Sequence, residues 1–389
     1  MRWASLDLCI RAIWPPQRVG GINGALQGVL LGSMLALAAC APAAEPSPTA
    51  KPAAPAPAAD AAKPAAPAAK PNIPREVIDG ATREGQLRLY WTSTATEEWR
   101  QKFQDAFNEY YGLKVTISDT RGNDWARDTA KVISEAAAGQ KPAWDVMLTT
   151  ESHHSDLFHN GLLGQHKFKE LFGVPGEAIM YQGGAFTYAN QIALPAYNKN
   201  LVKPEDVPKS WEDLLDPKWK DKIGVSVATH HWARLSQIWG DDKTTQYVTR
   251  LAALNPSLNT PSGLNQKLEL GEVQLLATQI DTFIRVSREK NGPVVWAESI
   301  SPVLVQSMMV GPLKDGPNPN AALLFAGFLA SERGQKLWQD FQAQSSIYAE
   351  GSPYNKLVKG KEVVVLTEEF IEKELEPRTA KYGKILGFR

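Results

Sequence analysis

A pattern of apolar strand, hydroxyl-rich turn and amphipathic helix recurs along this chain and restricts its fold more than any other feature. Residues 87–91 (LRLYW) have the pattern of a strand, and they are followed by TST and then by aromatic residues at helical spacing. The unit returns at 144–148 and 273–277, each time with a polar turn before the next helix. Strands that alternate with helices predict crossover units with parallel pairing. The sequence therefore predicts an α/β fold whose sheets are mixed, mainly parallel and flanked by helices.

The stretch 189–227 separates two groups of these units. It contains an extended apolar run, several prolines, a short helix and a strand at 223–227. A chain of 389 residues is long enough for two cores and some non-globular sequence. We therefore expect two lobes joined by crossing segments, with lobe 1 formed by 74–188 and 304–389 and lobe 2 formed by 189–303.

The first 40 residues have the composition of a bacterial secretion signal. Three arginines precede an uncharged apolar run at 21–39, although an apolar run of about 20 residues could also remain as a membrane helix. The run ends in LAAC at 37–40, which resembles the lipobox of bacterial lipoproteins. That resemblance implies cleavage before Cys40 and lipidation of its thiol. We expect a signal peptide at 1–39 and a lipoprotein anchored in the bilayer of the cell envelope, facing the periplasm or the outside.

Residues 40–73 are predicted to form a disordered tether behind that anchor. After Cys40 the segment is almost entirely alanine and proline, which cannot bury enough apolar surface to offset the entropy of ordering. The only other cysteine is Cys9, so the mature chain has none for a disulfide or a zinc–thiolate site. The formal net charge is zero and nucleic-acid-binding motifs are absent, which argues against a nucleic-acid partner.

Standard catalytic signatures are also absent, including the nucleophile elbow, the zinc-protease helix motif and the phosphate-binding loop. Two histidine pairs, His153-His154 and His230-His231, each follow a predicted strand. They could contact a ligand or a metal, or they could be solvated or capping side chains, because their spacing is not diagnostic of a metal site. We expect no catalytic residue, no cofactor and no dedicated metal site.

The polar turns are the candidate ligand-binding region. In parallel α/β sheets, ligands gather beyond the carboxyl ends of the strands, where helix N-termini offer free amides. The alternative role of these hydroxyl groups is to cap helices. Tyr188 lies before the first crossing and could line a cleft. The candidate ligand-binding residues are Thr92, Ser93, Thr94, Thr149, Thr150, Glu151, Ser152, Tyr188, Thr229, His230, His231, Gln279 and Asp281.

Several segments in the same order resemble the type 2 periplasmic solute-binding proteins, and most of all the group that includes ferric-iron-binding components of ABC importers. They are EGQLRLYWTST (84–94), EAAAGQKPAWDVMLTT (135–150), AYNKNLV (196–202), PKSWEDLLDPKWKDKI (208–223), LELGEVQLLA (268–277) and PNPNAALLFAGFLASERGQ (317–335). The resemblance implies two α/β lobes joined by two crossing segments. It also implies that the lobes close on a small solute and dock on a membrane permease.

The resemblance indicates the ligand less clearly than it indicates the fold. Its ferric-binding members carry a tyrosine pair after the GEV strand, where this chain has ATQIDTFIRV (277–286), and often a histidine where it has TSTATEE (92–98). Glu151 could match a carboxylate position of the group. We expect a small anion, a metal or a metal chelate as the ligand. The competing hypotheses are a sensory lipoprotein that serves a signalling partner, and an enzyme on the same fold with His230 or His231 as general base.

Overall fold

The computed structural model describes residues 73–388 of the chain. The signal peptide expected at 1–39, the lipidation site expected at Cys40 and nearly all of the tether expected at 40–73 lie outside these residues. Among residues 73–388, no helix combines the length and the apolar composition needed to cross a bilayer.

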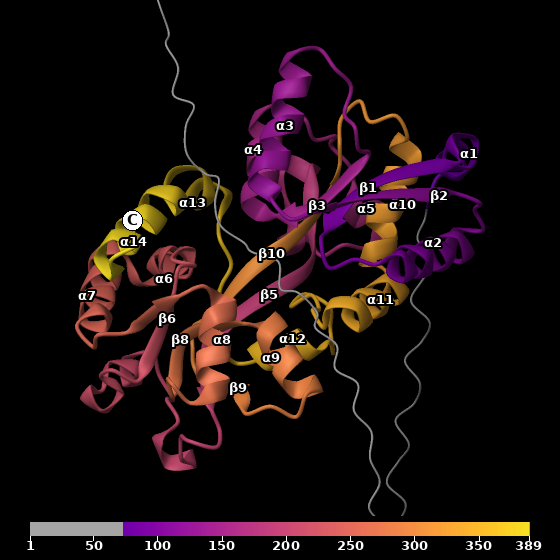
Figure 1. Cartoon of the computed structure of the whole chain (residues 1–389). Coiled ribbons are helices and arrows are strands. Elements are labelled where there is room, and N and C mark those ends of the chain that lie inside the picture. The colour runs from indigo at the N-terminus through magenta and orange to yellow at the C-terminus, as the bar shows by residue number, and fades with distance from the viewer. Residues whose placement is uncertain (1–72, 389) are drawn as a thin grey trace, which may run out of the picture. The chain divides into compact units, whose positions relative to one another are not determined.

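One continuous sheet of mixed parallel and antiparallel pairing connects all the strands. The strands are β1 Gln86–Thr92, β2 Thr116–Gly122, β3 Val146–Thr150, β4 Ile179–Met180, β5 Ala185–Asn198, β6 Ile223–Ser226, β7 Ser257–Asn259, β8 Leu275–Ile280, β9 Val294–Trp296, β10 Val303–Pro312 and β11 Val363–Val364. Their order is β2-β1-β3-β10-β5-β8-β6-β7, with β4 and β9 beside β5 and with β11 beside β10. We call β1–β3 and the helices that cover them the first half, and β6–β8 and their helices the second half (Figure 1).

The helices alternate with the strands in both halves, as the recurring pattern predicts. They are α1 Arg75–Glu84, α2 Glu97–Tyr111, α3 Trp125–Ala137, α4 Glu151–His159, α5 Phe168–Phe172, α6 His230–Trp239, α7 Asp241–Ala252, α8 Pro261–Leu270, α9 Asp281–Glu289, α10 Pro319–Ala330, α11 Glu332–Gln342, α12 Pro353–Val358, α13 Glu368–Lys373 and α14 Leu375–Leu386. Pairing is parallel between β1 and both β2 and β3, and between β6 and both β7 and β8. The predicted α/β fold with mainly parallel pairing in each half is confirmed.

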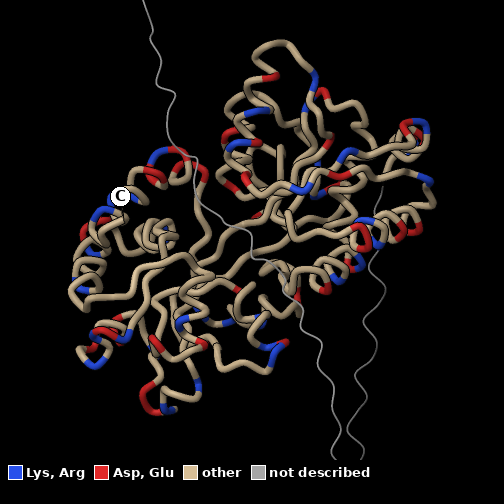
Figure 2. Tube along the Cα trace, in the orientation of Figure 1, with Lys and Arg blue, Asp and Glu red and all other residues tan. Residues whose placement is uncertain are grey.

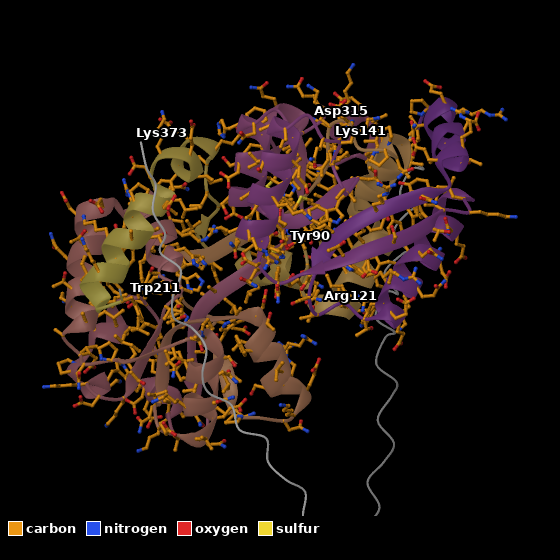
Figure 3. All side chains as sticks on the ribbon, turned by 45° about the horizontal axis from the view of Figure 1, so that its top comes forward. Tyr90, Arg121, Lys141, Trp211, Asp315 and Lys373 are labelled. Atoms are coloured by element: carbon orange, nitrogen blue, oxygen red, sulfur yellow. The ribbon has the colours of Figure 1, made fainter. Side chains whose placement is uncertain are left out.

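The short strand β1 is apolar because helices cover both of its faces. Successive side chains of a strand point to opposite faces, and here Leu89 and Trp91 join an apolar cluster with α2 and α10, while Tyr90 joins one with α3 and α4. A strand buried on both faces has few polar positions. Figure 3 shows Tyr90 in this half and Trp211 in the other, where the Trp211 indole nitrogen donates to the Pro302 carbonyl at 3.0 Å.

Helix α2 begins two residues later than its capping signal suggests. The T-x-x-E spacing of Thr94 and Glu97 predicts a cap at Thr94, but Thr96 is the residue before the first helical turn. Its hydroxyl accepts from the Trp99 amide at 3.4 Å, which supplies one of the acceptors that a helix N-terminus needs. The prediction of Thr94 as the cap is wrong, so its hydroxyl is available for other contacts.

The two crossing strands, β5 and β10, run antiparallel beside each other from one half into the other (Figure 1). Their pairing extends from Leu304 with Ala193 to Val310 with Phe186, with one register shift between Met308 and Met309. The expected pair of crossings between the halves therefore consists of adjacent, hydrogen-bonded strands. The exact lobe boundaries remain a prediction.

The C-terminal residues after β10 contact both halves. Strand β11 pairs in parallel with β10, α13 packs against α4, and α14 packs against α6 and α7. We assigned this tail to the first lobe, yet Phe370, Tyr382 and Leu386 lie in the apolar core of the second half. Figure 2 shows basic and acidic positions interspersed along most helices of the described residues.

Candidate functional site

The polar turns after β3 and β8 lie beside the middle of the two crossing strands. Strand β3 ends where Thr150 pairs with Met308, and β8 ends where Ile280 pairs with Ala193. Between these points, β10 and β5 pair with each other, and no further described strand pairs with their outer edges. Free strand edges expose unpaired backbone groups, and here side chains from the two halves fill both edges.

At the edge of β10, Arg234 of α6 forms a buried ion pair with Glu151 at the start of α4. The two side chains are 3 % and 2 % exposed. The Arg234 guanidinium also donates to the Val305 carbonyl of β10 at 3.0 Å. This group, which we call the Arg234 cluster, joins the first half, the second half and a crossing strand. One carboxylate oxygen of Glu151 and the Nε of Arg234 have no partner among the described residues.

Histidines of both pairs lie on the same helices as Glu151 and Arg234, and burial keeps their rings neutral. The pKa of His154 is lowered to about 4 because the ring is buried, and its Nδ1 lies 3.1 Å from the Thr149 hydroxyl. His231 Nδ1 lies 2.9 Å from the hydroxyl of Thr278, and burial likewise lowers its pKa, with smaller contributions from the charges of His230 and Arg234. Neutral, hydrogen-bonded imidazoles of this kind fix the turns around the ion pair.

The remaining polar side chains of this turn bond to one another. The Thr150 hydroxyl lies 2.7 Å from His153 Nδ1 and 3.1 Å from the Ser152 hydroxyl. Burial lowers the pKa of His153 to about 4 and that of His230 to about 3. The four predicted residues Thr149 to Ser152 are therefore gathered at one site with both histidine pairs nearby.

At the opposite edge, Asp281 at the start of α9 accepts four hydrogen bonds. They come from the backbone amide of Ile192 in β5 at 3.1 Å, the Tyr354 hydroxyl at 2.9 Å, the Gln344 amide at 3.4 Å and the Thr282 hydroxyl at 3.4 Å. Burial raises the pKa of Asp281 to about 6, against the opposing effect of these donors. We call this group the Asp281 cluster.

The first hydroxyl turn reaches the Asp281 cluster through α11. The hydroxyls of Thr92 and Thr94 lie 3.1 Å apart, and Thr94 accepts from the Gln342 amide at 2.8 Å. Two residues later Gln344 contacts Asp281. Ser93 is exposed. A cavity of about 450 Å³ opens beside Asp281, with α9 on one side and α11 and α12 on the other.

Three predicted residues lie away from both clusters. Tyr188 is buried in the apolar core of the first half. The Thr229 hydroxyl donates to the Thr379 carbonyl of α14 at 3.1 Å, and the Gln279 amide donates to the Pro261 carbonyl at the start of α8 at 3.2 Å. These contacts are structural. The candidate site therefore consists of the remaining predicted residues, which are Thr92–Thr94, residues 149–152, the histidines and Asp281.

Sequence reasoning missed Arg234 and Tyr354, which complete the two clusters. Arg234 lies in the segment HHWARLSQIW, where a charged residue interrupts an apolar helix. A charge at such a position is buried only when it has a partner, and this signal could have selected Arg234. Tyr354 carries no local signal, because its contact with Asp281 joins residues 73 apart in sequence. Among residues 73–388, no group of three or more histidine, cysteine or acidic side chains is arranged to hold a metal ion.

Residues 102–349 match the family described as bacterial extracellular solute-binding protein. Among curated relatives, "Iron uptake protein A1" of Synechocystis is 23% identical over 304 residues, which cover 72% of this chain and 81% of that protein. The fold matches solved periplasmic proteins. The Trichodesmium protein IdiA (FutA) in complex with iron and citrate has a TM-score of 0.63 and 20% identity, with 78% of this chain and 100% of that chain covered.

A second solved structure carries a different ligand. AfuA of Actinobacillus pleuropneumoniae, described with exogenous fructose-6-phosphate bound, has a TM-score of 0.56 and 22% identity, with coverage of 78% of this chain and 99% of that chain. At these identities the likeness to solved structures concerns the fold. The ligands named for these proteins are iron with citrate in one case and a sugar phosphate in the other.

Proposed function

The chain belongs to the bacterial extracellular solute-binding protein family, and we propose that it is the substrate-binding lipoprotein of an ABC importer. It captures a small anion or a metal chelate between its two halves and delivers it to a membrane permease. Its family consists of binding proteins, so the chain is not an enzyme.

The observation that carries this proposal is the meeting of polar turns from both halves at two paired crossing strands. Two paired strands that connect the halves can bend at one point while each half keeps its own core, which is the geometry of hinge closure. The turns at residues 92–94 and 149–152 come from the first half and Asp281 comes from the second. A ligand held between these turns would contact both halves and so favour the closed form.

The side chains at these turns favour an anion or a chelate over a bare ferric ion. Residues 277–286 contain no tyrosine, and a hard trivalent cation needs several anionic oxygen ligands. Glu151 is paired with Arg234 through one carboxylate oxygen, so a metal ion at the other oxygen would compete with the guanidinium for the negative charge. A chelate or an organic anion avoids this competition.

The lipid anchor is the second part of the proposal, and it rests on the LAAC motif at 37–40. A lipidated Cys40 followed by an alanine- and proline-rich tether would hold the receptor near its permease with some reach. The Cys40→Ser variant should move from the membrane fraction to the soluble fraction and should lose incorporation of labelled palmitate. Retention of both properties would contradict the anchor without affecting the solute-binding role.

Native mass spectrometry of freshly purified protein tests the receptor function. We expect a small anion or chelate to copurify, and the identified compound should raise the melting temperature by mass action. Uptake of that compound by cells should then depend on this chain and on an ABC permease. A bound solute whose uptake is unchanged when the chain is deleted would reject import and support a sensory role.

A further inference from the structure

We propose that the cavity beside α9 binds a small organic carboxylate that carries an apolar portion. The inference rests on the proposed function, because it names the class of solute that the region between the halves takes. The cavity has a volume of about 450 Å³, which lies within the range of small-molecule sites. Its walls come from α9 in the second half, from α11 in the first half and from α12.

Three basic side chains line this cavity: Arg285 and Arg288 from α9, and Lys356 from α12. Arg288 and Lys356 form no ion pair with any residue in the range 73–388, and Arg285 pairs there with Glu289 at 3.2 Å. The Nε of Arg285 is buried and has no hydrogen-bond partner in the same range. The cavity therefore contains donors and positive charge that its own residues leave unused.

The two arginines act on the interior of the cavity as well as on its rim. Burial and the neighbouring Asp281 raise the pKa of the Tyr354 phenol, and the positive charges of Arg288 and Arg285 oppose that rise. Both guanidinium groups therefore lie close enough to affect a buried side chain of the lining. An anionic ligand group placed between them would gain charge-assisted hydrogen bonds, and the fork geometry of a guanidinium matches a carboxylate.

The acidic side chains of the lining do not cancel this preference. Asp281 already accepts four hydrogen bonds, and burial raises its pKa to about 6. Glu298 is exposed at the rim. A cationic ligand would meet Arg285, Arg288 and Lys356 with only one acid free to pair with it.

The lining of the cavity also includes an apolar wall. It consists of Ile284, Trp296, Pro353 and Leu357. The indole nitrogen of Trp296 donates to the Gln279 carbonyl at 2.8 Å, which fixes the orientation of the ring. Burial of apolar ligand surface against such a wall stabilises a complex in proportion to the area removed from water. This wall distinguishes an organic acid from inorganic phosphate or sulfate.

Calorimetric titration of the full chain, purified from detergent-solubilised membranes, tests the proposal. The probes are phenylacetate, 4-hydroxybenzoate and isovalerate, the neutral amide of each acid, and inorganic phosphate. We expect at least one acid to bind with one-to-one stoichiometry, and at least about tenfold more tightly than its amide and than phosphate. If none of the three acids binds more tightly than its amide, the proposal is overturned.

Variants assign the binding to this cavity. Arg288→Gln and Lys356→Gln should each weaken binding of the acid about tenfold. The matched control is Arg250→Gln, since Arg250 pairs with Glu212 on another surface and does not line the cavity; it should leave the affinity unchanged. Melting curves check that all three variants fold. Equal affinity in the wild type and in both folded cavity variants would place the acid elsewhere and refute the inference.

Failure of this inference can be told apart from failure of the proposed function. If a copurified solute and its uptake are unaffected by Arg288→Gln and Lys356→Gln, the receptor function stands and the cavity assignment falls. If the acid binds here but uptake does not depend on the chain, the cavity assignment stands and the role in import falls.

Discussion

Replacement of Arg234 by methionine should destabilise the protein far more than the loss of an ordinary ion pair. Arg234 and Glu151 are 3 % and 2 % exposed, so water screens neither charge. The Arg234→Met change removes the guanidinium and leaves the Glu151 carboxylate buried without its partner. Breaking one side of a buried pair typically costs about 3–5 kcal/mol, and the Val305 carbonyl also loses its donor.

The double variant separates the contribution of the ion pair to stability from the cost of burying an unpaired charge. Glu151→Met combined with Arg234→Met leaves no buried charge, and such replacements are often neutral or stabilising. We therefore expect the double variant to recover most of the stability that the single variant loses. The exposed pair of Arg250 and Glu212 is the control: Arg250→Met should cost less than about 1 kcal/mol.

Urea unfolding at pH 7.5, followed by tryptophan fluorescence, measures these differences. The dependence of the free energy of unfolding on urea concentration must be the same for the wild type and the variants, so that the extrapolated free energies can be compared. A loss below about 1 kcal/mol for Arg234→Met would show that Glu151 finds water or another partner. A double variant as unstable as the single one would refute the assignment of the loss to an unpaired carboxylate.

Three further predictions use the same unfolding assay. Burial raises the pKa of Asp281 to about 6, so the stability that this group contributes is present below pH 4 and is lost as the pH rises through 6. The free energy of unfolding of Asp281→Asn, measured relative to that of the wild type, should therefore increase by up to about 3 kcal/mol between pH 4 and pH 7. Burial lowers the pKa of His154 to about 4, so the wild type should lose up to about 3 kcal/mol as the pH falls from 6.5 to 4, and His154→Asn should lose less over that window. Trp211→Phe should cost about 2–3 kcal/mol at neutral pH, because the Pro302 carbonyl loses its indole donor and a cavity remains; a cost below about 0.5 kcal/mol would contradict this packing.

The recurring units of the fold could be predicted because their signals are local. An apolar strand such as 87–91 indicates burial on both faces, and a turn rich in hydroxyl side chains indicates the start of the next helix. The cap at Thr96 was missed because TSTAT offers four hydroxyls within five residues, and only the backbone path selects among them. The contact of α14 with the second half was missed because it depends on packing between segments more than 100 residues apart.

The candidate site was predicted in part for a related physical reason. Residues 149–152 and Asp281 follow strands directly, so their place at a sheet edge follows from topology. Arg234, Tyr354 and the basic residues of α9 act through contacts with other segments, which the order of residues does not reveal. Tyr188 shows the converse limit, because its place in the crossing strand β5 says nothing about which face its ring occupies.

The place of β10 in the sheet has a consequence for how the chain acquires its structure. This strand comes from residues 303–312, yet it lies between β3 and β5, which are made much earlier. Strand β3 therefore lacks its neighbour on one side until three quarters of the chain is available, and contacts of such high sequence separation slow folding. A chain that is made from its N-terminus onward cannot pair β3 with β10 until residues 303–312 are present. We expect the whole body of residues 73–388 to fold late and to unfold in one cooperative transition.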